Sequence, residues 1–355
     1  MKGVILCAGL GTRLRPLTHT AAKHLIPVAN KPILQYGIEA LRDAGVKDIA
    51  LVVGQSQDEI RAAMQDGASL GVRIQYVEQT DPKGLAHALS VARDFVGDDQ
   101  VLMYLGDNVV DGGITDFVEA YHQSGADAAI LVNEVSDPSH FGIVELRDGE
   151  IIRVVEKPKV PASNLAIVGV YAFNSSIFPA IEKTTFSARG ELEITDAIQN
   201  LIDAGKRVLP FILTRWWKDT GRPADVLDLN RRLLERMQEF SFRGKACPET
   251  QIIGSVEVGE ETEITRSVLR GPIIVGKRCR LSDCYIGPFT SIGDGVTITN
   301  TEIGYSIVME NSGVTGVGMR IDHSLIGRNV SIIRADHRPH AHRFILADDS
   351  RVEVG

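Results

Sequence analysis

The chain has 355 residues, and Asp and Glu outnumber Lys and Arg, which leaves a formal net charge of −8. This length predicts two domains, each large enough to bury a core of its own. The acidic balance and the lack of a basic block argue against nucleic-acid binding, because that function needs a basic stripe on the surface.

The sequence shows no signal for a membrane or for secretion. No apolar run approaches the ~18 residues that a membrane span needs. About four apolar residues precede Gly9, roughly half of what a signal peptide requires. The four cysteines lack metal-ligand spacing, and two of them fall at apolar strand positions, as reduced thiols do. We therefore expect a cytoplasmic protein that binds neither nucleic acid nor membrane.

The first element expected along the chain is a buried strand at Val4–Cys7 that runs into a phosphate-binding turn. Gly9 and Gly11 would let successive backbone N–H groups of this turn point at one anion. Arg13 adds a forked guanidinium that suits phosphate oxygens. The stretch lacks the Gly-Lys-Ser/Thr ending of a P-loop, and Leu14 replaces the third glycine of a dinucleotide fingerprint. An ordinary strand-to-loop turn is the alternative for a Gly-x-Gly pair taken alone.

Short apolar runs alternate with helical periods from the N-terminus to about residue 240. This alternation is typical of a mostly parallel sheet covered by helices. It predicts a Rossmann-like α/β domain with a mixed sheet over residues 1–240. After the first strand, further strands are expected at 49–53, 72–77, 101–105, 129–132, 143–146, 151–155 and 167–173. Helical spacing of apolar residues occurs at 33–41, 85–96, 194–202 and 226–234.

A different pattern begins after Met237. Apolar residues recur every 17 positions, as at Val258, Val275 and Ile292, and Ile/Val-Gly pairs accompany them. Such a repeat predicts triangular coils of short strands, which build a left-handed parallel β-helix of the hexapeptide type over residues 250–335. The register is lost at 309–319, which we expect to form a loop extruded from one coil. Residues 336–355 no longer repeat and are expected to cap the open end.

Two charged residues lie where ligand contacts are expected in an α/β domain. Asp107 follows an apolar strand and a glycine, at the carboxyl end of the strand where open sheets bind ligands. Lys23 lies in a segment of little periodicity, as a lysine that reaches into a cleft would. The alternatives are an aspartate that caps a turn and a solvated surface lysine.

The residues from Gly9 to Pro32 resemble the signature of the sugar-1-phosphate nucleotidylyltransferases. Members of this family join a nucleoside triphosphate to a sugar 1-phosphate and release pyrophosphate. The family often has glycine where this chain has Ala8. The resemblance covers the whole N-terminal domain, and the C-terminal repeats match the long-form members. The matching residues are Gly9-x-Gly11-Thr12-Arg13-Leu14-x-Pro16-x-Thr18, Lys23 and Pro27-Val28-x-Asn30-Lys31-Pro32.

The resemblance implies a nucleotide site and a magnesium site. Mg²⁺ would be held by Asp107 and Asp219, since this ion takes few protein ligands and keeps several other oxygens. The Gln79 amide can accept a hydrogen bond from N3–H and donate one to O4 of thymine or uracil, whereas cytosine inverts both groups. The nucleotide residues implied in this way are Leu6, Ala8, Gly9, Gly11, Thr12, Arg13, Gln79 and Gly84.

The resemblance also implies a sugar-phosphate site and three catalytic residues. Arg13 would hold the leaving pyrophosphate, while Lys23 and Lys157 would bring in the sugar phosphate. No general base is needed, because a phosphate monoester is already anionic at neutral pH. Without the resemblance, Glu156 and Lys157 could equally be a solvated pair at the turn made by Pro158. The implied sugar-phosphate residues are Gly142, Glu156, Lys157, Gly169, Tyr171 and Arg189.

The expected reaction converts dTTP and α-D-glucose 1-phosphate into dTDP-glucose and pyrophosphate, by in-line attack on the α-phosphorus. UTP is the alternative nucleotide, because thymine and uracil differ by one methyl group and Gln79 does not separate them. Outside the family, the alternatives are a β-helix acyltransferase and a non-catalytic regulatory subunit. The cluster of His337, His340 and His342 is expected to be a solvated or subunit-contact surface. The flat faces of a β-helix favour a homo-oligomer.

Overall fold

The computed structural model describes the whole chain except residues 238–239, 335–343, 345 and 354–355. Its contacts divide the chain into two compact units. The first unit comprises residues 1–10, 21–25 and 33–219, and the second comprises 11–20, 26–32 and 220–355. The predicted surface cluster of His337, His340 and His342 and much of the predicted cap at 336–355 lie outside the described residues.

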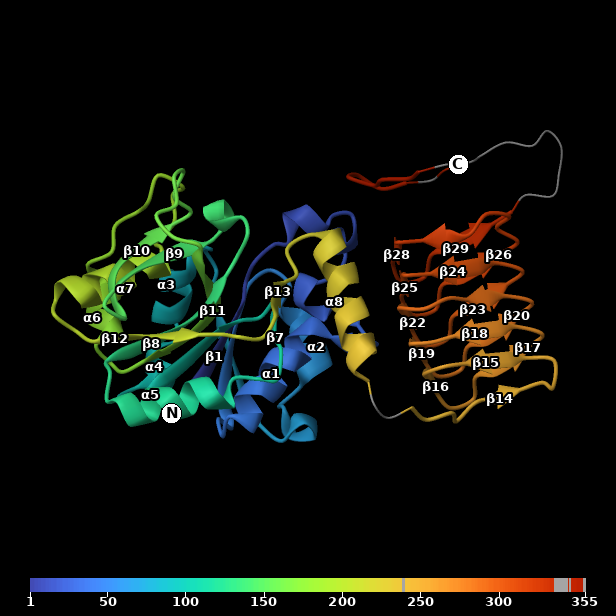
Figure 1. The fold of residues 1–355 in the computed structure, drawn as a ribbon, viewed down its shortest axis with the longest axis horizontal. Helices are drawn as coiled ribbons and strands as arrows, with labels where there is room; N and C mark the ends of the chain where they lie inside the picture. The colour runs from blue at the N-terminus through green and yellow to red at the C-terminus, as the bar shows by residue number, and fades with distance from the viewer. Residues whose placement is uncertain (238–239, 335–343, 345, 354–355) are drawn as a thin grey trace. The chain divides into compact units, whose positions relative to one another are not determined.

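Among the described residues, a nine-stranded mixed sheet forms the centre of the first unit (Figure 1). Its main path has the order β10-β9-β11-β6-β1-β4-β5, and β8 and β12 extend it beside β11. Strands β1, β4, β5 and β6 are parallel to one another, whereas β11 is antiparallel to both β6 and β8. The predicted mixed, mostly parallel sheet is thus confirmed. The strands are β1 (Lys2–Cys7), β4 (Asp48–Val53), β5 (Arg73–Glu78), β6 (Val101–Leu105), β8 (Ala128–Glu134), β9 (Gly142–Arg147), β10 (Glu150–Glu156), β11 (Leu165–Phe173) and β12 (Val208–Ile212).

Helices cover both faces of this sheet, because the central strands are apolar on both sides. In β1, Val4 and Leu6 belong to one core cluster, while Ile5 and Cys7 belong to the other. The core cluster that contains Val4 also includes residues of α3 (Leu85–Ser90), α4 (Arg93–Val96), α6 (Ile177–Glu182) and α7 (Ile194–Asp203). The core cluster that contains Ile5 includes residues of α1 (Ile33–Asp43), α2 (Gln57–Met64) and α5 (Thr115–Ser124). The helical period predicted over 85–96 is therefore split into two short helices.

A small antiparallel pair of strands stands apart from the large sheet. It joins β7 (Asn108–Val110) to β13 (Trp217–Asp219), with Asp219 opposite Asn108. Sequence periodicity does not predict this pair, because three residues are too few to show alternation. Its effect is to bring the Trp-Trp-Lys-Asp segment next to the residues that follow β6.

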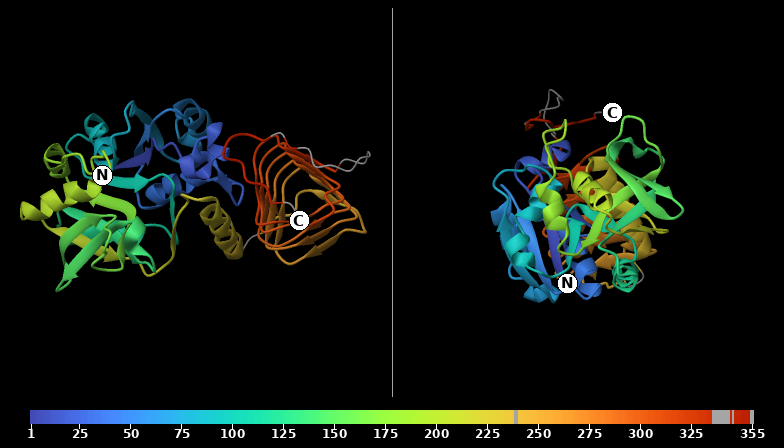
Figure 2. Two further views of the ribbon diagram at one scale, coloured as in Figure 1. Left: turned by 90° about the horizontal axis from the view of Figure 1, so that it is seen from above. Right: turned by 90° about the vertical axis from the view of Figure 1, so that its left-hand side faces the viewer.

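The second unit contains a left-handed parallel β-helix, whose triangular coils are seen end-on in the left view of Figure 2. One sheet consists of β14 (Lys245–Ala246), β17 (Glu263–Thr265), β20 (Arg280–Ser282), β23 (Thr297–Thr299), β26 (Gly313–Thr315) and β29 (Ser331–Ile333). The next consists of β15 (Gln251–Ile253), β18 (Val268–Arg270), β21 (Tyr285–Ile286), β24 (Glu302–Gly304) and β27 (Ile321–Asp322). The last consists of β16 (Val256–Val258), β19 (Ile273–Val275), β22 (Thr290–Ile292), β25 (Ile307–Val308) and β28 (Leu325–Ile326).

The prediction of an extruded loop at 309–319 is wrong. This stretch contains β26, which pairs in parallel with β23 and β29 and places Val314 in the core of the β-helix. The 17-residue repeat of the sequence is interrupted there because two turns of the coil differ in length from the earlier ones. The step from Ile303 to Val308 takes five residues, whereas the matching step of the previous coil, from Ile286 to Ile292, takes six. The step from Val314 to Ile321 takes seven residues, whereas the matching step from Ile298 to Ile303 takes five. The two irregular turns shift the repeat without interrupting the coils.

The second unit also holds most of the N-terminal signature. Its Pro27–Pro32 segment is a hairpin of β2 (Pro27–Val28) and β3 (Lys31–Pro32), with positive φ at both Ala29 and Asn30, as a tight two-residue turn requires. The hairpin is anchored by α8 (Pro223–Arg236). Buried Asn230 of this helix accepts hydrogen bonds from the Ala29 N–H and the Ser291 hydroxyl, at 2.8 and 2.7 Å.

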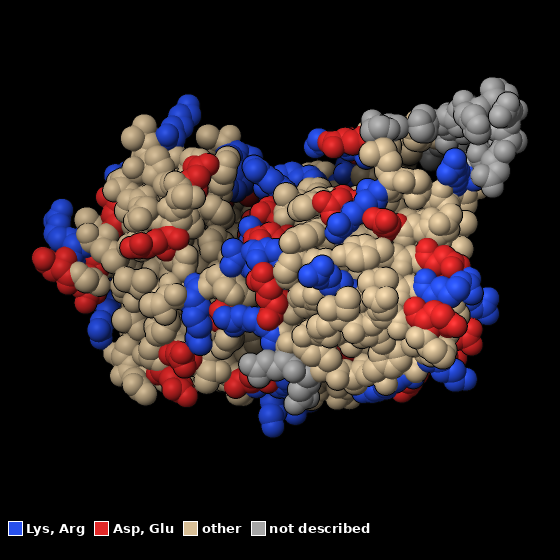
Figure 3. Space-filling model, turned by 45° about the vertical axis from the view of Figure 1, so that its right-hand side comes forward, with Lys and Arg blue, Asp and Glu red and all other residues tan. Residues whose placement is uncertain are grey.

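The surface carries charged side chains of both signs (Figure 3). Acidic and basic side chains are interspersed over the face of the molecule that Figure 3 shows. Among the described residues, no helix is long and apolar enough to cross a membrane.

Candidate active site

The candidate site of the first unit lies where parallel strands of its sheet end. β1 and β6 run side by side in the same direction, so Ala8 and Gly9 emerge beside Gly106 and Asp107. The Gly106 N–H donates to the Leu6 carbonyl at 3.0 Å, which holds the two strand ends together. A Cβ on Gly106 would lie 2.8 Å from the Cys7 sulfur, so glycine is required for this close approach.

A buried ion pair occupies this strand edge. The Lys23 ammonium donates a hydrogen bond to Oδ2 of Asp107, and the two side chains are only 16% and 15% exposed. Burial by itself would lower the pKa of Lys23, but the charges of Asp107 and Asp219 outweigh it and raise that pKa. Burial would likewise raise the pKa of Asp107, yet the charge and hydrogen bond of Lys23 hold it below its usual range. Both groups are therefore charged at neutral pH.

Gly9 completes the surroundings of the lysine. A Cβ at Gly9 would lie 3.3 Å from the Lys23 ammonium nitrogen, so the bare backbone of the turn faces this cation. The glycine turn, a cation and a carboxylate therefore lie next to one another within the first unit. Gly11, Thr12 and Arg13 belong to the second unit, where Gly11 adopts a left-handed φ of 64° before a short 3₁₀ turn, Thr12–Leu14.

The second carboxylate, Asp219, reaches the same place through β13. It lies opposite Asn108, the residue after Asp107, and its charge acts on Lys23. Asn108 is itself fixed, because its amide donates to the Val168 carbonyl at 2.8 Å. A Cβ on Gly169 would collide with this amide, so the packing of Asn108 accounts for the glycine there. Asn108 was not among the predicted site residues, although its place directly after Asp107 was a usable signal.

Two carboxylates around a buried cation fit a small divalent metal ion. The described residues contain no group of three or more His, Cys, Asp or Glu side chains that could hold a metal by themselves. Asp107 and Asp219 would therefore supply part of an oxygen shell, and phosphate or water oxygens the rest. Mg²⁺ favours this arrangement, because it is commonly bound by one or two carboxylates together with substrate phosphates.

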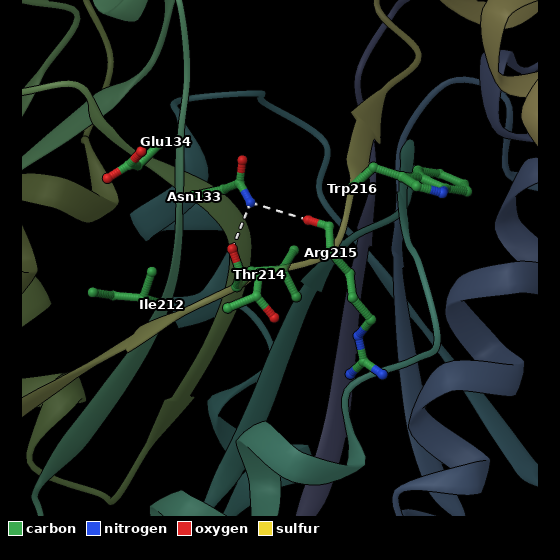
Figure 4. Close-up of a pocket in the computed structure, with 7 residues that line it drawn as sticks. Asn133, Glu134, Ile212, Thr214, Arg215 and Trp216 are labelled. Atoms are coloured by element: carbon green, nitrogen blue, oxygen red, sulfur yellow. Dashed lines mark hydrogen bonds between the residues drawn. The ribbon is translucent and has the colours of Figure 1, made fainter.

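A pocket of about 570 Å³ lies nearby, at the carboxyl ends of β8 and β12 (Figure 4). The amide of Asn133 donates to the carbonyls of Leu213 and Arg215, at 2.8 and 3.1 Å. These bonds tie the segment that leads into β13 to the end of β8. None of the predicted site residues lines this pocket. The two hydrogen bonds of Asn133 help to position β13, the strand that carries Asp219.

Gln79 follows β5 and is buried, with 4% of its surface exposed. Its side-chain amide nitrogen lies 2.8 Å from Nδ1 of His87 in α3. Gly84, at the start of the same helix, has a φ of 105°, and a Cβ there would lie 2.7 Å from the backbone nitrogen of Leu192. Sequence reasoning missed His87, whose position one turn into the helix after Gly84 was the available signal.

The close approach at Gly84 joins the Gln79 turn to the segment that carries Arg189. The Leu192 N–H donates to the Lys83 carbonyl at 2.7 Å, and the Ala86 N–H donates to the Leu192 carbonyl at 3.1 Å. These two bonds attach the turn before α3 to the segment that follows Arg189. Gly84 is needed there for the contact between two backbones.

A second charged cluster gathers several of the predicted sugar-phosphate residues. Glu156 ends β10 directly opposite Gly142 of β9, and a Cβ on that glycine would lie 3.2 Å from a Glu156 carboxylate oxygen. Arg189 donates to Glu156 and to Glu191, both at 3.0 Å. The Lys157 ammonium lies 3.5 Å from the Glu156 carboxylate. The cluster thus offers carboxylates that can accept from hydroxyls and cations that can contact a phosphate.

Two other predicted residues lie in the apolar core. The ring of Tyr171 is 3% exposed and stacks on Phe173 with a centroid distance of 5.9 Å. Burial raises the pKa of its phenol well above the usual range. Leu6 is likewise buried in the sheet. The side chains of Tyr171 and Leu6 pack against other core residues, and a contact of either with a ligand stays a prediction.

Comparisons with known proteins agree with the geometry. A family model described as nucleotidyl transferase matches residues 2–236. A glucose-1-phosphate thymidylyltransferase of Streptomyces antibioticus is 49% identical over 356 residues, which cover 100% of this chain and 99% of that protein. A protein of the same name from Streptomyces griseus is 45% identical over 355 residues, with 100% and 99% covered.

A solved structure supports the fold of the N-terminal part. It is a Bacillus anthracis protein proposed to be a glucose-1-phosphate thymidylyltransferase, in complex with a sucrose. The identity is 34%, the TM-score is 0.63, and the match covers 68% of this chain and 98% of that one.

Proposed function

Because this chain belongs to the nucleotidyl transferase family, we propose that it is a glucose-1-phosphate thymidylyltransferase. It would convert dTTP and α-D-glucose 1-phosphate into dTDP-glucose and pyrophosphate. The observation that carries the proposal is the buried Lys23, which contacts Asp107 at the end of β6 and has Asp219 among the charges acting on it. A chain without catalysis would have no need to hold these three charges together beside a glycine turn.

The reaction is the attack of one anion on another. A phosphate monoester oxygen of glucose 1-phosphate attacks the α-phosphorus of dTTP in line, and the bond to pyrophosphate breaks. The barrier comes from repulsion between the two anions and from the charge that grows on pyrophosphate. The chain's task is to hold and neutralise them, so positioning and fixed positive charge supply most of the rate.

Several cations of the chain suit these tasks. Lys23 would face the phosphates at the strand edge, since its charge is retained even though it is buried. Lys157 would receive the sugar phosphate, while Glu156 beside it accepts hydrogen bonds from sugar hydroxyls. Arg13 would take up charge on the leaving pyrophosphate. Asp107 and Asp219 would hold a magnesium ion, which would supply further positive charge to the phosphates.

Gln79 would read the base. Its amide presents an acceptor for N3–H and a donor for O4, the pattern of thymine and uracil. The methyl group of thymine is worth about 1 kcal/mol in an apolar pocket, so dTTP and UTP would both be accepted to some degree. The two Streptomyces relatives are named for thymidylyl transfer, which favours dTTP.

The direct test is release of pyrophosphate from dTTP or UTP in the presence of Mg²⁺ and a panel of sugar 1-phosphates. We expect glucose 1-phosphate with dTTP to give the highest kcat/KM and no release without the sugar phosphate. Consumption of acetyl-CoA, assayed in parallel, would reveal an acyltransferase instead. Failure with every sugar phosphate would overturn the proposal.

The location and assembly of the enzyme are part of the same proposal. The four cysteines are free thiols, three of them buried, as in proteins of a reducing compartment such as the cytoplasm. A homo-oligomer stays a prediction from the flat faces of the β-helix, and light scattering of the purified chain tests it.

A further inference from the structure

The two ends of the Gln79 amide are chemically opposite, so its orientation decides which base it accepts. The oxygen accepts hydrogen bonds and the nitrogen only donates them. Thymine and uracil offer a donor at N3 and an acceptor at C4, whereas cytosine offers an acceptor at N3 and a donor at C4. Rotation of the amide by half a turn would exchange one preference for the other. Gln79 is buried, so a neighbouring protein group must fix this rotation.

His87 is the group that contacts the amide. Its Nδ1 lies 2.8 Å from the amide nitrogen of Gln79. Because an amide nitrogen cannot accept a hydrogen bond, Nδ1 of His87 must be the acceptor, and the ring is neutral with its proton on Nε2. One N–H of the amide is used in this way. The oxygen and the other N–H remain for a base.

We propose that His87 fixes the orientation of the Gln79 amide and thereby makes the nucleotide site select bases with N3–H and O4, thymine and uracil, over cytosine. This inference rests on the proposed function, in which Gln79 contacts the base. His87 acts through Gln79, so it is a positioning residue for specificity.

The surroundings of His87 favour its neutral form. Burial in the first place, and then the charge of Lys83, lower the pKa of His87, while Asp81 opposes them weakly. Lys83 and Asp81 lie on the turn before α3. The other described elements that pack closely on this helix are β1, α6 and α7, and none of them adds a charged group that acts on the ring. At neutral pH the imidazole therefore keeps its acceptor.

Protonation would reverse the selection. A protonated His87 has an N–H at Nδ1, which faces the N–H of the amide and repels it. Rotation of the amide would relieve the repulsion by turning its oxygen toward His87. The amide nitrogen would then face N3 of the base and the pattern would fit cytosine. The site should therefore discriminate less against dCTP as the pH falls below the pKa of His87.

The experiment measures kcat/KM for dTTP and for dCTP with glucose 1-phosphate between pH 5.5 and 8. The ratio of the two values is the readout, because protonation of the sugar phosphate or the triphosphate affects both nucleotides alike. We expect the ratio of the unmodified enzyme to stay high while His87 is neutral and to fall only once the pH drops below its lowered pKa. In His87→Leu, which removes the acceptor, the ratio at pH 8 should fall by roughly tenfold or more.

A conservative variant separates this role from a merely structural one. His87→Glu places a carboxylate acceptor next to the amide. Unlike His87→Leu, it should therefore keep the dTTP/dCTP ratio that the unmodified enzyme shows at pH 8, and this ratio should stay constant down to pH 5.5. His122→Leu, an exposed histidine in α5, is the control for the same substitution in a helix and should match the unmodified enzyme. Circular dichroism checks that all variants are folded.

The outcomes separate the two proposals. If the unmodified chain transfers no nucleotide, the proposed function fails, and binding of dTTP and dCTP measured by calorimetry replaces kcat/KM as the readout for His87. If the chain is active but His87→Leu keeps the ratio of the unmodified enzyme, His87 does not orient Gln79 and this inference is overturned.

Discussion

At the scale of single residues, the pair of Lys23 and Asp107 explains the candidate site best. Its charges are kept by mutual attraction against the cost of burial, as the directions of both pKa shifts show. The depressed pKa of Asp107 gives stability that is present above about pH 4 and lost as the pH falls through the folded-state pKa. The raised pKa of Lys23 gives stability that is present below about pH 10.4 and lost as the pH rises through its folded-state value.

Asp107→Asn should therefore damage both folding and activity. It leaves the buried Lys23 ammonium without its ion-pair partner, which costs about 3–5 kcal/mol of unfolding free energy for a buried pair. Urea unfolding at pH 7 measures this cost, and the double variant with Lys23→Met should recover part of it. Pyrophosphate release should drop in both variants. Full Mg²⁺-dependent activity in Asp107→Asn would rule out the assignment of this carboxylate to the metal.

Gly84 offers a second test at the same scale. Its positive φ and the backbone of Leu192, 2.7 Å from a Cβ at this position, both exclude a side chain. Gly84→Ala should lower the free energy of unfolding by more than about 1 kcal/mol, and it should raise KM by moving the Arg189 segment. Gly205 also has a positive φ, of 72°, but nothing within 4 Å of a Cβ, so Gly205→Ala measures the cost of a left-handed glycine position without any contact. Equal losses of stability in the two variants, measured by thermal unfolding, would mean that the contact with Leu192 is unimportant.

At the scale of elements, strong periodicity allowed the strands and helices to be predicted. The apolar runs at β1 and β6 and the 17-residue repeat of the β-helix each follow from side-chain spacing. The pair of β7 and β13 could not be found in this way, because each strand has three residues and their register depends on tertiary contacts. The hairpin of β2 and β3 escaped prediction for the same reason.

The anchor of that hairpin gives a prediction for the second unit. Asn230 is buried, and its amide accepts hydrogen bonds from Ala29 and Ser291 and donates one to the Phe289 carbonyl at 3.0 Å. Asn230→Leu leaves these groups without their partner, at a cost of about 1–3 kcal/mol for each that stays dry. We expect urea unfolding followed by far-ultraviolet circular dichroism to show a loss of several kcal/mol.

A matched substitution shows whether the loss comes from this network. Asn200 lies in α7, is half-buried, and makes one side-chain hydrogen bond, to the Ala180 carbonyl at 3.1 Å. Asn200→Leu should thus cost clearly less than Asn230→Leu. Similar costs would indicate that the anchor contributes no more than an ordinary helix asparagine.

At the scale of the whole molecule, the sequence predicted an α/β region followed by a β-helix, and both are present. It did not predict that contacts group residues 11–20 and 26–32 with residues 220–355. This grouping depends on side chains such as Asn30, whose amide donates to the Ile292 carbonyl at 2.7 Å, far away in the sequence. Periodicity carries no information about such contacts, so the division of the signature between the two units needed the structure.

The two units can be followed separately, because both tryptophans, Trp216 and Trp217, lie in the first unit. Their fluorescence therefore reports the unfolding of that unit, which also contains buried His24. Burial in the first place, together with the charge of Lys23, lowers the pKa of His24 to about 3. In the unfolded chain the pKa returns to about 6.5, so between these values the unfolded state binds the extra proton.

Stability of the first unit should consequently fall as the pH drops from about 6.5 toward 4, and the loss should reach several kcal/mol, since each unit of pH costs about 1.4 kcal/mol over this range. Urea titrations followed by tryptophan fluorescence at several pH values measure it. His24→Gln removes the titrating group and should flatten the dependence, whereas His122→Gln, at an exposed position, should leave it unchanged. A dependence that stays equally steep in His24→Gln would assign the acid sensitivity to other groups and contradict the burial of a neutral His24.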